Sequence, residues 1–119
     1  MFLNSSVDLC LKNHVRKFAN MNSNEPYSEE QKKIALIAKA LGHPVRVYII
    51  NFLSKQACCY SGDISDILPI AKSTLSQHLT ELKKAGLIQG EIETPKIKYC
   101  LNKNNWDLAK KLFKELFDI

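Results

Sequence analysis

The sequence predicts a mainly α-helical domain that carries a small β-hairpin close to its C-terminal end. Apolar residues recur with helical spacing over most of the 119 residues. Residues 96–101 instead alternate strictly between apolar side chains and lysine or cysteine, which is typical of a strand. Glycine and proline separate these segments, where helices and turns start or stop. A chain of this length forms one domain that buries enough surface to fold without a disulfide.

The N-terminal part of the chain is predicted to stand apart from the rest. Apolar residues at helical spacing over residues 7–18 indicate a first helix, and the polar stretch at residues 20–26 ends it. We therefore expect an N-terminal helix and linker at residues 1–26, followed by the main domain at residues 27–119.

Two helices are expected at the start of the main domain. Ser28 and Gln31 form a capping box for the first of them, and Gly42 ends it. Pro44 is well placed at the first position of the second helix. The inward faces are predicted to consist of Ile34, Ile37, Ala38 and Leu41 in the first helix and Val45, Ile49, Phe52 and Leu53 in the second.

A short extended segment and a short helix follow. Residues 57–60 are too few for a helix and are read as extended. Ser61 or Gly62 then caps a helix that ends near Leu68, because Pro69 restricts the residue before it to non-helical geometry.

The next helix carries the first argument about function. Its leucines at positions 75, 79 and 82 form an apolar stripe, and Gly86 ends it. Two short helices joined by a tight turn are the layout of a helix-turn-helix. Small polar residues such as Ser73, Thr74 and Gln77 suit the major groove of DNA, where they reach base edges and phosphates. An ordinary helical hairpin with a solvated face would give the same pattern.

The predicted hairpin favours DNA binding over that alternative. It runs from residues 87–92 through a turn at 93–95 to residues 96–101. A helix-turn-helix followed by a hairpin with lysines near its tip is a winged helix, whose wing lies along the phosphate backbone. Its second strand places Ile97, Tyr99 and Leu101 on one face and Lys96, Lys98 and Cys100 on the other, so that one face is expected to be apolar and the other basic.

Charge agrees with a polyanionic partner. The chain has a net charge of +5, and residues 72–103 hold six lysines against three glutamates, a net +3. A charge of this size is a weak signal by itself, because many solvated surfaces show it.

The redox state of the cysteines at positions 10, 58, 59 and 100 depends on the cellular compartment. The first residues lack the pattern of a signal peptide, and no apolar run reaches the roughly 18 residues of a membrane span, so we expect a cytoplasmic protein without a membrane partner. Thiols stay reduced there. The cysteines are therefore expected to be buried, metal-binding or redox-sensing rather than bridged.

Three stretches resemble one known family. "ALGHPVRVYIINFL", "STLSQHLTELKKAGLI" and "KYCLN" look like the arsenic-repressor (ArsR/SmtB) family of winged-helix regulators, and the similarity runs from about Ser28 to Ile119. The resemblance implies a mainly α winged helix-turn-helix that is dimeric. It also implies a homodimeric repressor that leaves its double-stranded DNA operator when a metal or metalloid binds, and whose first and last domain helices form the dimer interface.

Site residues follow from the motif and the resemblance together. The DNA-binding set is expected to be Lys72, Ser73, Thr74, Ser76, Gln77, Lys84, Lys96 and Lys98, with His78 added as a family position near the DNA. The last helix has more apolar surface than a small domain readily covers, although packing on its own domain is the alternative. The expected interface residues are Trp106, Ala109, Leu112, Phe113, Leu116 and Phe117.

The family's metal ligands do not carry over. Arsenic-responsive members place a Cys-x-Cys directly before an Asp, and in alignment on Asp63 those two positions hold Tyr60 and Gly62. Zinc-responsive members use histidines and carboxylates of the last helix, and this chain has no histidine from Asn104 onward. Any ligand site must therefore be this chain's own.

A thiol site is expected around Cys58 and Cys59. In winged helices the short extended segment usually pairs with the second wing strand, which brings Cys100 close. Successive residues of a strand point to opposite faces, so Cys58 and Cys59 reach Cys100 together only if a bulge twists the segment. Cys10 is a spare ligand. Trivalent arsenic or antimony, or another thiophilic ion, would suit such thiolates as inducer, and Lys98 would lower the pKa of Cys100.

Other interpretations stay open. The cysteines equally suit buried core positions, a thiol redox sensor, or a regulator without any ligand, and DNA binding itself requires no cofactor. No nucleophile motif or glycine-rich phosphate loop points to an enzyme. A dimerisation module that does not bind DNA is the third class.

Overall fold

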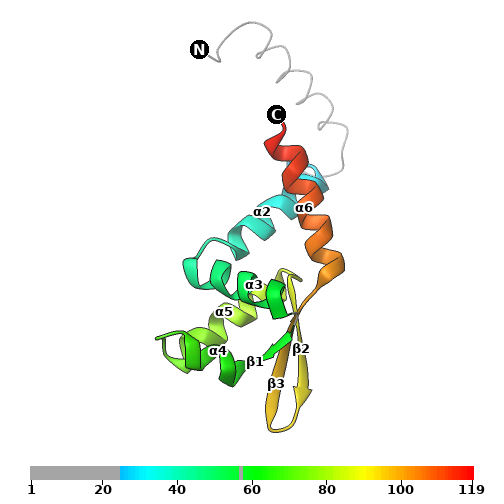
Figure 1. The fold of residues 1–119 in the computed structure, drawn as a ribbon. Helices are drawn as coiled ribbons and strands as arrows, with labels where there is room; N and C mark the ends of the chain where they lie inside the picture. Colours follow the sequence, from blue (N-terminus) through cyan, green and yellow to red (C-terminus); the bar gives the residue numbers. More distant parts are fainter. Residues whose placement is uncertain (1–24, 57) are drawn as a thin grey trace, which may run out of the picture. The chain divides into compact units, whose positions relative to one another are not determined.

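The computed structural model describes residues 25–56 and 58–119, and it has the predicted mainly α fold with a β-hairpin. The chain divides into two compact units, residues 1–33 and 34–119. The helix predicted at residues 7–18 lies outside the described residues. Within the described part, no helix is both long and apolar enough to cross a membrane. The elements, labelled in Figure 1, are α2 (Glu29–Ala40), α3 (Pro44–Gln56), β1 (Cys58–Tyr60), α4 (Ser61–Ile67), α5 (Lys72–Lys84), β2 (Ile88–Glu93), β3 (Lys96–Leu101) and α6 (Lys103–Phe117).

Local sequence signals set several helix ends as expected. The capping box of α2 is confirmed, because the Gln31 amide donates to Ser28 Oγ at 3.1 Å and the Ser28 amide donates to Gln31 Oε1 at 3.0 Å. Pro44 is the first residue of α3, as predicted. The predicted Ile37 is buried, but Ala38 is exposed, and Ala40 is the second buried residue of α2.

The N-cap of helix α4 lies one residue before Ser61 and two before Gly62, the two predicted caps. Its N-cap is Tyr60, whose side chain makes no capping bond, and the first helical residue is Ser61. The helix ends at Ile67, and Leu68 is extended with ψ 126°, as expected for the residue before Pro69.

One apolar core joins the four helices α2 to α5, the sheet and α6. The side chains of Ile49, Leu53 and Leu82 are fully buried at its centre. Burying a Leu or Ile side chain contributes about 1.5–3 kcal/mol, so these positions fix how α3 and α5 pack. The remaining buried members are Ile37, Ala40, Ile50, Cys59, Ile64, Leu75, Leu79, Leu87, Ile88, Ala109 and Leu112.

The three strands form an antiparallel sheet in the order β1-β3-β2. The segment before α4 thus pairs with the second hairpin strand, as expected, with Cys58 opposite Cys100 and Tyr60 opposite Lys98. Glu93 belongs to β2, so the turn between the hairpin strands consists of Thr94 and Pro95 alone.

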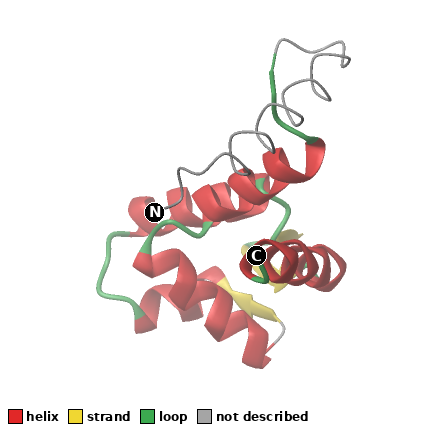
Figure 2. Ribbon diagram, turned by 90° about the horizontal axis from the view of Figure 1, so that it is seen from above, coloured by secondary structure: helices red, strands yellow, loops and turns green. Residues whose placement is uncertain are grey.

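The helix α6 leaves the sheet directly after β3 and runs away from the tip of the hairpin; it is seen nearly end-on in Figure 2. Asn102 caps it by accepting a 3.1 Å hydrogen bond from the Asn105 amide. The Asn105 side-chain amide in turn donates to the carbonyl of Gly86 at 2.8 Å. Gly86 has φ 78°, a left-handed conformation that favours glycine, so this turn and the start of α6 are held together.

Candidate nucleic-acid interface and cysteine pair

Helix α5 presents the polar surface expected of a recognition helix. Leu75, Leu79 and Leu82 are buried and anchor the helix on the core. The opposite side is exposed and polar, and its first turn has no side-chain cap, which leaves backbone amides free to meet an anion. The exposed predicted residues of α5 are Lys72, Ser73, Thr74, Ser76, Gln77 and Lys84.

The structure places His78 in the interior and not on this exposed side. It is 8% exposed, and its Nδ1 accepts a 3.0 Å hydrogen bond from Arg46 Nε. Arg46 also donates to the carbonyls of Lys39 and Ala40, so His78 ties α5, through Arg46 of α3, to the C-terminal end of α2. Burial, then the nearby His43, then Arg46 lower the pKa of His78. Its spacing within the leucine stripe was the sequence signal for burial.

The outer face of the wing is not the basic surface that the sequence suggested. Glu93 lies opposite Lys96 and Glu91 lies opposite Lys98, so each lysine faces a carboxylate across the hairpin. Glu93 also forms an ion pair with Lys98, with 3.8 Å between Glu93 Oε1 and Lys98 Nζ. The alternation in β3 was read correctly, but the partner strand supplies as many negative charges as β3 supplies positive ones.

Tyr60 at the end of β1 joins this network. Its hydroxyl donates a 2.6 Å hydrogen bond to Glu93, and the ammonium of Lys96 lies over its ring at 5.3 Å from the centroid. Glu93 raises the pKa of Tyr60 by this hydrogen bond and by its charge. Both wing lysines are therefore engaged by groups that depend on where β1 holds Tyr60.

The cysteines do not converge as three ligands. Cys58 and Cys100 are directly opposite each other on β1 and β3, with Cα atoms 4.0 Å apart, and they are joined by a disulfide. This corrects the expectation that bridging is the least favoured state of these thiols. Cys59 points to the other side of the sheet and is a buried free thiol, since successive strand residues alternate. Cys10 lies outside the described residues.

Cys59 is poorly suited to act as a thiolate ligand. Its Sγ donates to the carbonyl of Tyr60 at 3.5 Å and lies 4.0 Å from Asp63 Oδ2. Burial and the charge of Asp63 raise the pKa of Cys59. Among the residues the structure describes, no group of three or more His, Cys, Asp or Glu side chains could hold a metal ion.

A cavity of about 270 Å³ lies beside Cys58, and Cys100 is not among its lining residues. Cys58, Lys98 and Tyr60 line it together with Gln56, Cys59 and Asp63. A small oxidant or reductant can therefore approach Cys58 through this cavity.

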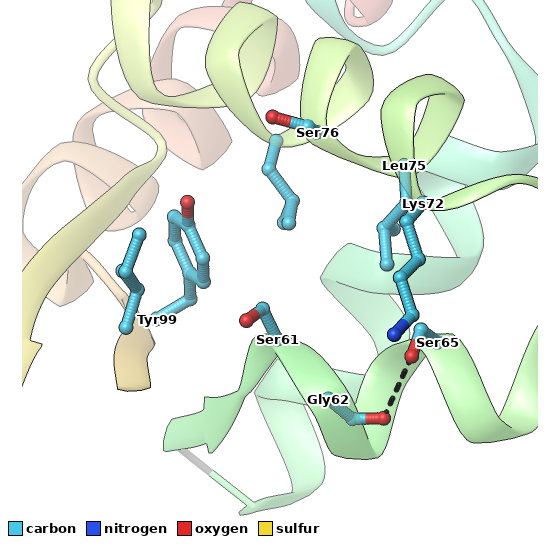
Figure 3. A pocket seen from close by; sticks show the side chains of 9 residues that line it. Ser61, Gly62, Ser65, Lys72, Leu75, Ser76 and Tyr99 are labelled. Atoms are coloured by element: carbon cyan, nitrogen blue, oxygen red, sulfur yellow. Dashed lines mark hydrogen bonds between the residues drawn. The ribbon is translucent and has the colours of Figure 1, made fainter. Parts of the chain in front are cut away.

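A second cavity, of about 210 Å³, opens between α4, the start of α5 and the inner face of β3. Figure 3 shows Lys72 reaching from α5 toward Ser65, while Ser61 and Tyr99 lie on the side of the wing. Sequence reasoning included Lys72 and Ser76 in the DNA-binding set but missed Ser61, Ser65 and Tyr99, because only the fold brings them beside α5. Leu75, Leu79, Ile97 and Gly62 complete the lining.

The predicted interface residues of α6 divide into two groups. Ala109 and Leu112 are buried in the core, and Trp106 and Phe113 pack against it half-buried. Leu116 and Phe117 are exposed, as is Leu108, which the sequence did not single out. Part of the apolar surface of α6 thus packs on its own domain, as the alternative expected, and three apolar residues at its edges and near its C-terminal end are left exposed.

Comparison with known proteins gives similarities that agree with this geometry. The family model described as bacterial regulatory protein, arsR family, matches residues 43–89. The HTH-type transcriptional regulator YgaV of Escherichia coli K12 is 30% identical over 70 residues, which cover 59% of this chain and 71% of that protein. The biofilm growth-associated repressor of Agrobacterium fabrum is 32% identical over 87 residues, covering 73% and 71%. HlyU from Vibrio cholerae, a solved structure, has a TM-score of 0.63 at 25% identity and covers 78% of this chain and 100% of that one.

Proposed function

The chain belongs to the ArsR family of winged-helix transcriptional regulators, and we propose that it is a repressor that binds a duplex DNA operator as a homodimer and is released by thiol chemistry at Cys58 and Cys100. Membership of a family of transcriptional regulators agrees with the expectation of a protein that is not an enzyme.

The exposed polar side of α5 is the observation that carries DNA binding. Ser73, Thr74 and Gln77 are exposed on the first two turns, where a recognition helix meets base edges. Gln77 has the donor and acceptor pair that matches adenine, and Lys84 at the other end suits a phosphate. The leucine stripe on the opposite side is buried, so the helix has one outward orientation.

Dimerisation is supported by apolar residues of α6 that the core does not cover. Leu108, Leu116 and Phe117 are 43%, 38% and 75% exposed. Covering such a surface with a second copy follows the rule that apolar patches mark interaction sites. A two-fold dimer presents two recognition helices to half-sites about 34 Å apart, which doubles the number of DNA contacts.

The opposed pair of Cys58 and Cys100 supports redox control in preference to a three-thiol metalloid site. Two thiols that face each other across antiparallel strands pass readily between dithiol and disulfide. With hydrogen peroxide as oxidant, one thiolate attacks peroxide, which breaks the O–O bond and gives a sulfenic acid and hydroxide. The second thiolate then displaces hydroxide from the sulfenic sulfur as the S–S bond forms, and each hydroxide takes a proton from solvent to become water. A dithiol reductant returns both thiols by exchange.

Binding of arsenite or antimonite is the second candidate for the signal that releases the DNA, because Cys58 and Cys100 face each other. The same two sulfurs, when reduced, form a facing pair that a thiophilic ion can bridge. Cys59 does not complete a third position from its side of the sheet.

The link between the cysteines and the DNA runs through Tyr60. The disulfide fixes β1 against β3, and β1 places Tyr60 where it holds Glu93 and Lys96. In this state the wing lysines interact within the protein, so fewer cations are free for phosphates. Reduction loosens β1 and releases them. We therefore expect oxidation to lower DNA affinity.

Selection from a random duplex library tests the function directly. The reduced full chain should enrich a two-fold symmetric sequence, and affinity for it should fall steeply with salt. Failure to bind any duplex at 50 mM salt would instead make the chain a dimerisation module that does not bind DNA. Enrichment of a sequence with equal affinity in its reduced, peroxide-treated and arsenite-treated forms would leave a repressor without thiol control.

A further inference from the structure

We propose that the cavity between α4, α5 and β3 is the seat of one DNA backbone phosphate, held by the ammonium of Lys72 and the hydroxyl of Ser61, with the hydroxyls of Ser76 and Tyr99 at the other end of the cavity. The assignment rests on the proposed DNA-binding function and names a contact site within it. We call this cavity, which lies between α4, α5 and β3, the helix–wing cleft.

The position of the helix–wing cleft is the first reason. A recognition helix enters the major groove, and a wing that follows it lies over the neighbouring minor groove or its backbone. A single phosphodiester strand separates those two grooves. That strand must cross between α5 and the wing, where the cleft opens between Lys72 and Ser76 on one side and Ile97 and Tyr99 on the other.

The charge of the cleft is the second reason. Lys72 is the one cation among the lining residues, and no carboxylate lines the cavity, although Asp63 and Asp66 belong to the adjacent helix. No ion pair of Lys72 occurs among the described residues, in contrast to Lys84 and Lys98. One free positive charge matches the single negative charge of a phosphodiester.

Hydroxyl donors complete the site. Residues 61, 76 and 99 supply three hydroxyl groups from three elements. Among the described residues, none of these hydroxyl groups makes a hydrogen bond within the protein. Ser65 is different, because its hydroxyl donates to the Gly62 carbonyl at 2.9 Å and so acts as a wall (Figure 3). Charge-assisted hydrogen bonds to phosphate are about twice as strong as neutral ones.

The apolar floor makes the site selective for a backbone rather than for a fully hydrated ion. Leu75, Leu79 and Ile97 line the cleft beside the polar groups. They lower the local dielectric and strengthen the attraction of Lys72 for an anion. They also offer a surface to the deoxyribose next to the phosphate. A volume of about 210 Å³ holds a phosphate group with bridging water, since one water takes about 30 Å³.

The test neutralises single phosphates in the selected duplex. Each backbone position is replaced in turn by an uncharged methylphosphonate, and affinity is measured for the reduced parent, Lys72→Gln and the matched control Lys111→Gln on α6. For the parent and for Lys111→Gln, we expect one position in each half-site to cost about tenfold, the loss expected of a charge-assisted bond. For Lys72→Gln the same replacement should change affinity less than twofold. The salt slope should fall by about one for each Lys72 lost from the dimer.

A second pair of variants and a competitor separate other outcomes. Ser61→Ala should weaken the effect of the same methylphosphonate, whereas Ser65→Ala should leave it as in the parent. If neutralising every position costs Lys72→Gln as much as the parent, the cleft holds no phosphate and the proposal falls. Saturation of the cleft by millimolar inorganic phosphate, seen as competition with DNA for the parent but not for Lys72→Gln at constant ionic strength, would assign it to a free anion and also overturn it. Absence of any duplex binding would instead reject the DNA-binding function itself.

Discussion

The hydroxyl of Tyr60, the last residue of β1, donates a 2.6 Å hydrogen bond to Oε2 of Glu93, the last residue of β2. The two residues are 33 positions apart in the sequence, and the bond connects the short strand that carries Cys58 with the tip of the wing. Glu93 is also the partner of Lys98. The position of β1 is therefore connected, through Tyr60 and Glu93, to the charged side chains of the wing.

Removing that hydroxyl should uncouple the wing from the cysteines. In Tyr60→Phe the disulfide between Cys58 and Cys100 should still form, because the change leaves the strand pairing intact. The affinities of the reduced and oxidised forms for the selected duplex are measured by fluorescence anisotropy. The difference in binding free energy between the two forms should be less than half of the difference in the parent. Tyr48→Phe changes an exposed tyrosine of α3; it is the matched control and should behave as the parent. A full redox response in Tyr60→Phe would show that Tyr60 is not the link.

Gln77 and Lys84 should differ in what they contribute to DNA binding. Replacing Gln77 by Ala should relax the preference at one base pair in each half-site by about 1–3 kcal/mol, because a base-reading contact is lost. Replacing Lys84 by Gln should weaken binding to all duplexes and reduce the salt slope by about one. Binding to selected and random duplexes at several salt concentrations distinguishes them. An equal loss on both duplexes for Gln77→Ala would remove it from the base-reading set.

Features that depend on residues close in the sequence could be predicted, and features that depend on distant residues could not. The capping box of Ser28 and Gln31 and the start of α3 at Pro44 depend on neighbours along the chain, and both were predicted correctly. The pairing of Lys98 with Glu93 depends on the hairpin register, so the wing face was wrongly expected to be basic. Whether Cys58 or Cys59 meets Cys100 also depends on register, which a three-residue strand does not specify.

His78 makes stability depend on pH. Its pKa is lowered in the folded protein, so between that folded value and the unfolded value of about 6.5 the unfolded chain binds more protons. Stability should therefore fall as pH drops below about 6.5, and the loss should level off below the folded pKa. Urea midpoints at pH 5.5 and 8.0 should differ less in His78→Gln, which keeps an acceptor for Arg46. An identical pH dependence in both proteins would contradict this role for the histidine.

The exposed side of α6 should control the oligomeric state. Leu116→Glu should raise the dimer dissociation constant by about tenfold or more, because an unpaired carboxylate at an apolar interface costs well over 1 kcal/mol. Lys111→Glu changes charge on the same helix without touching Leu116 and should leave the dimer intact. Sedimentation velocity at micromolar concentration gives both values. A parent that sediments as a monomer would count against this interface.

The affinity of the selected duplex for the reduced and the peroxide-oxidised protein is the most direct measurement of thiol-controlled repression. We expect oxidation to weaken binding roughly 5- to 150-fold, the range of a coupling free energy of about 1–3 kcal/mol, and to be reversed by dithiothreitol. Cys100→Ser should bind as the reduced parent whether or not peroxide is added, and Cys59→Ser should respond as the parent does. Equal affinities of the reduced and oxidised parent, with the disulfide between Cys58 and Cys100 verified by mass spectrometry, would contradict thiol control.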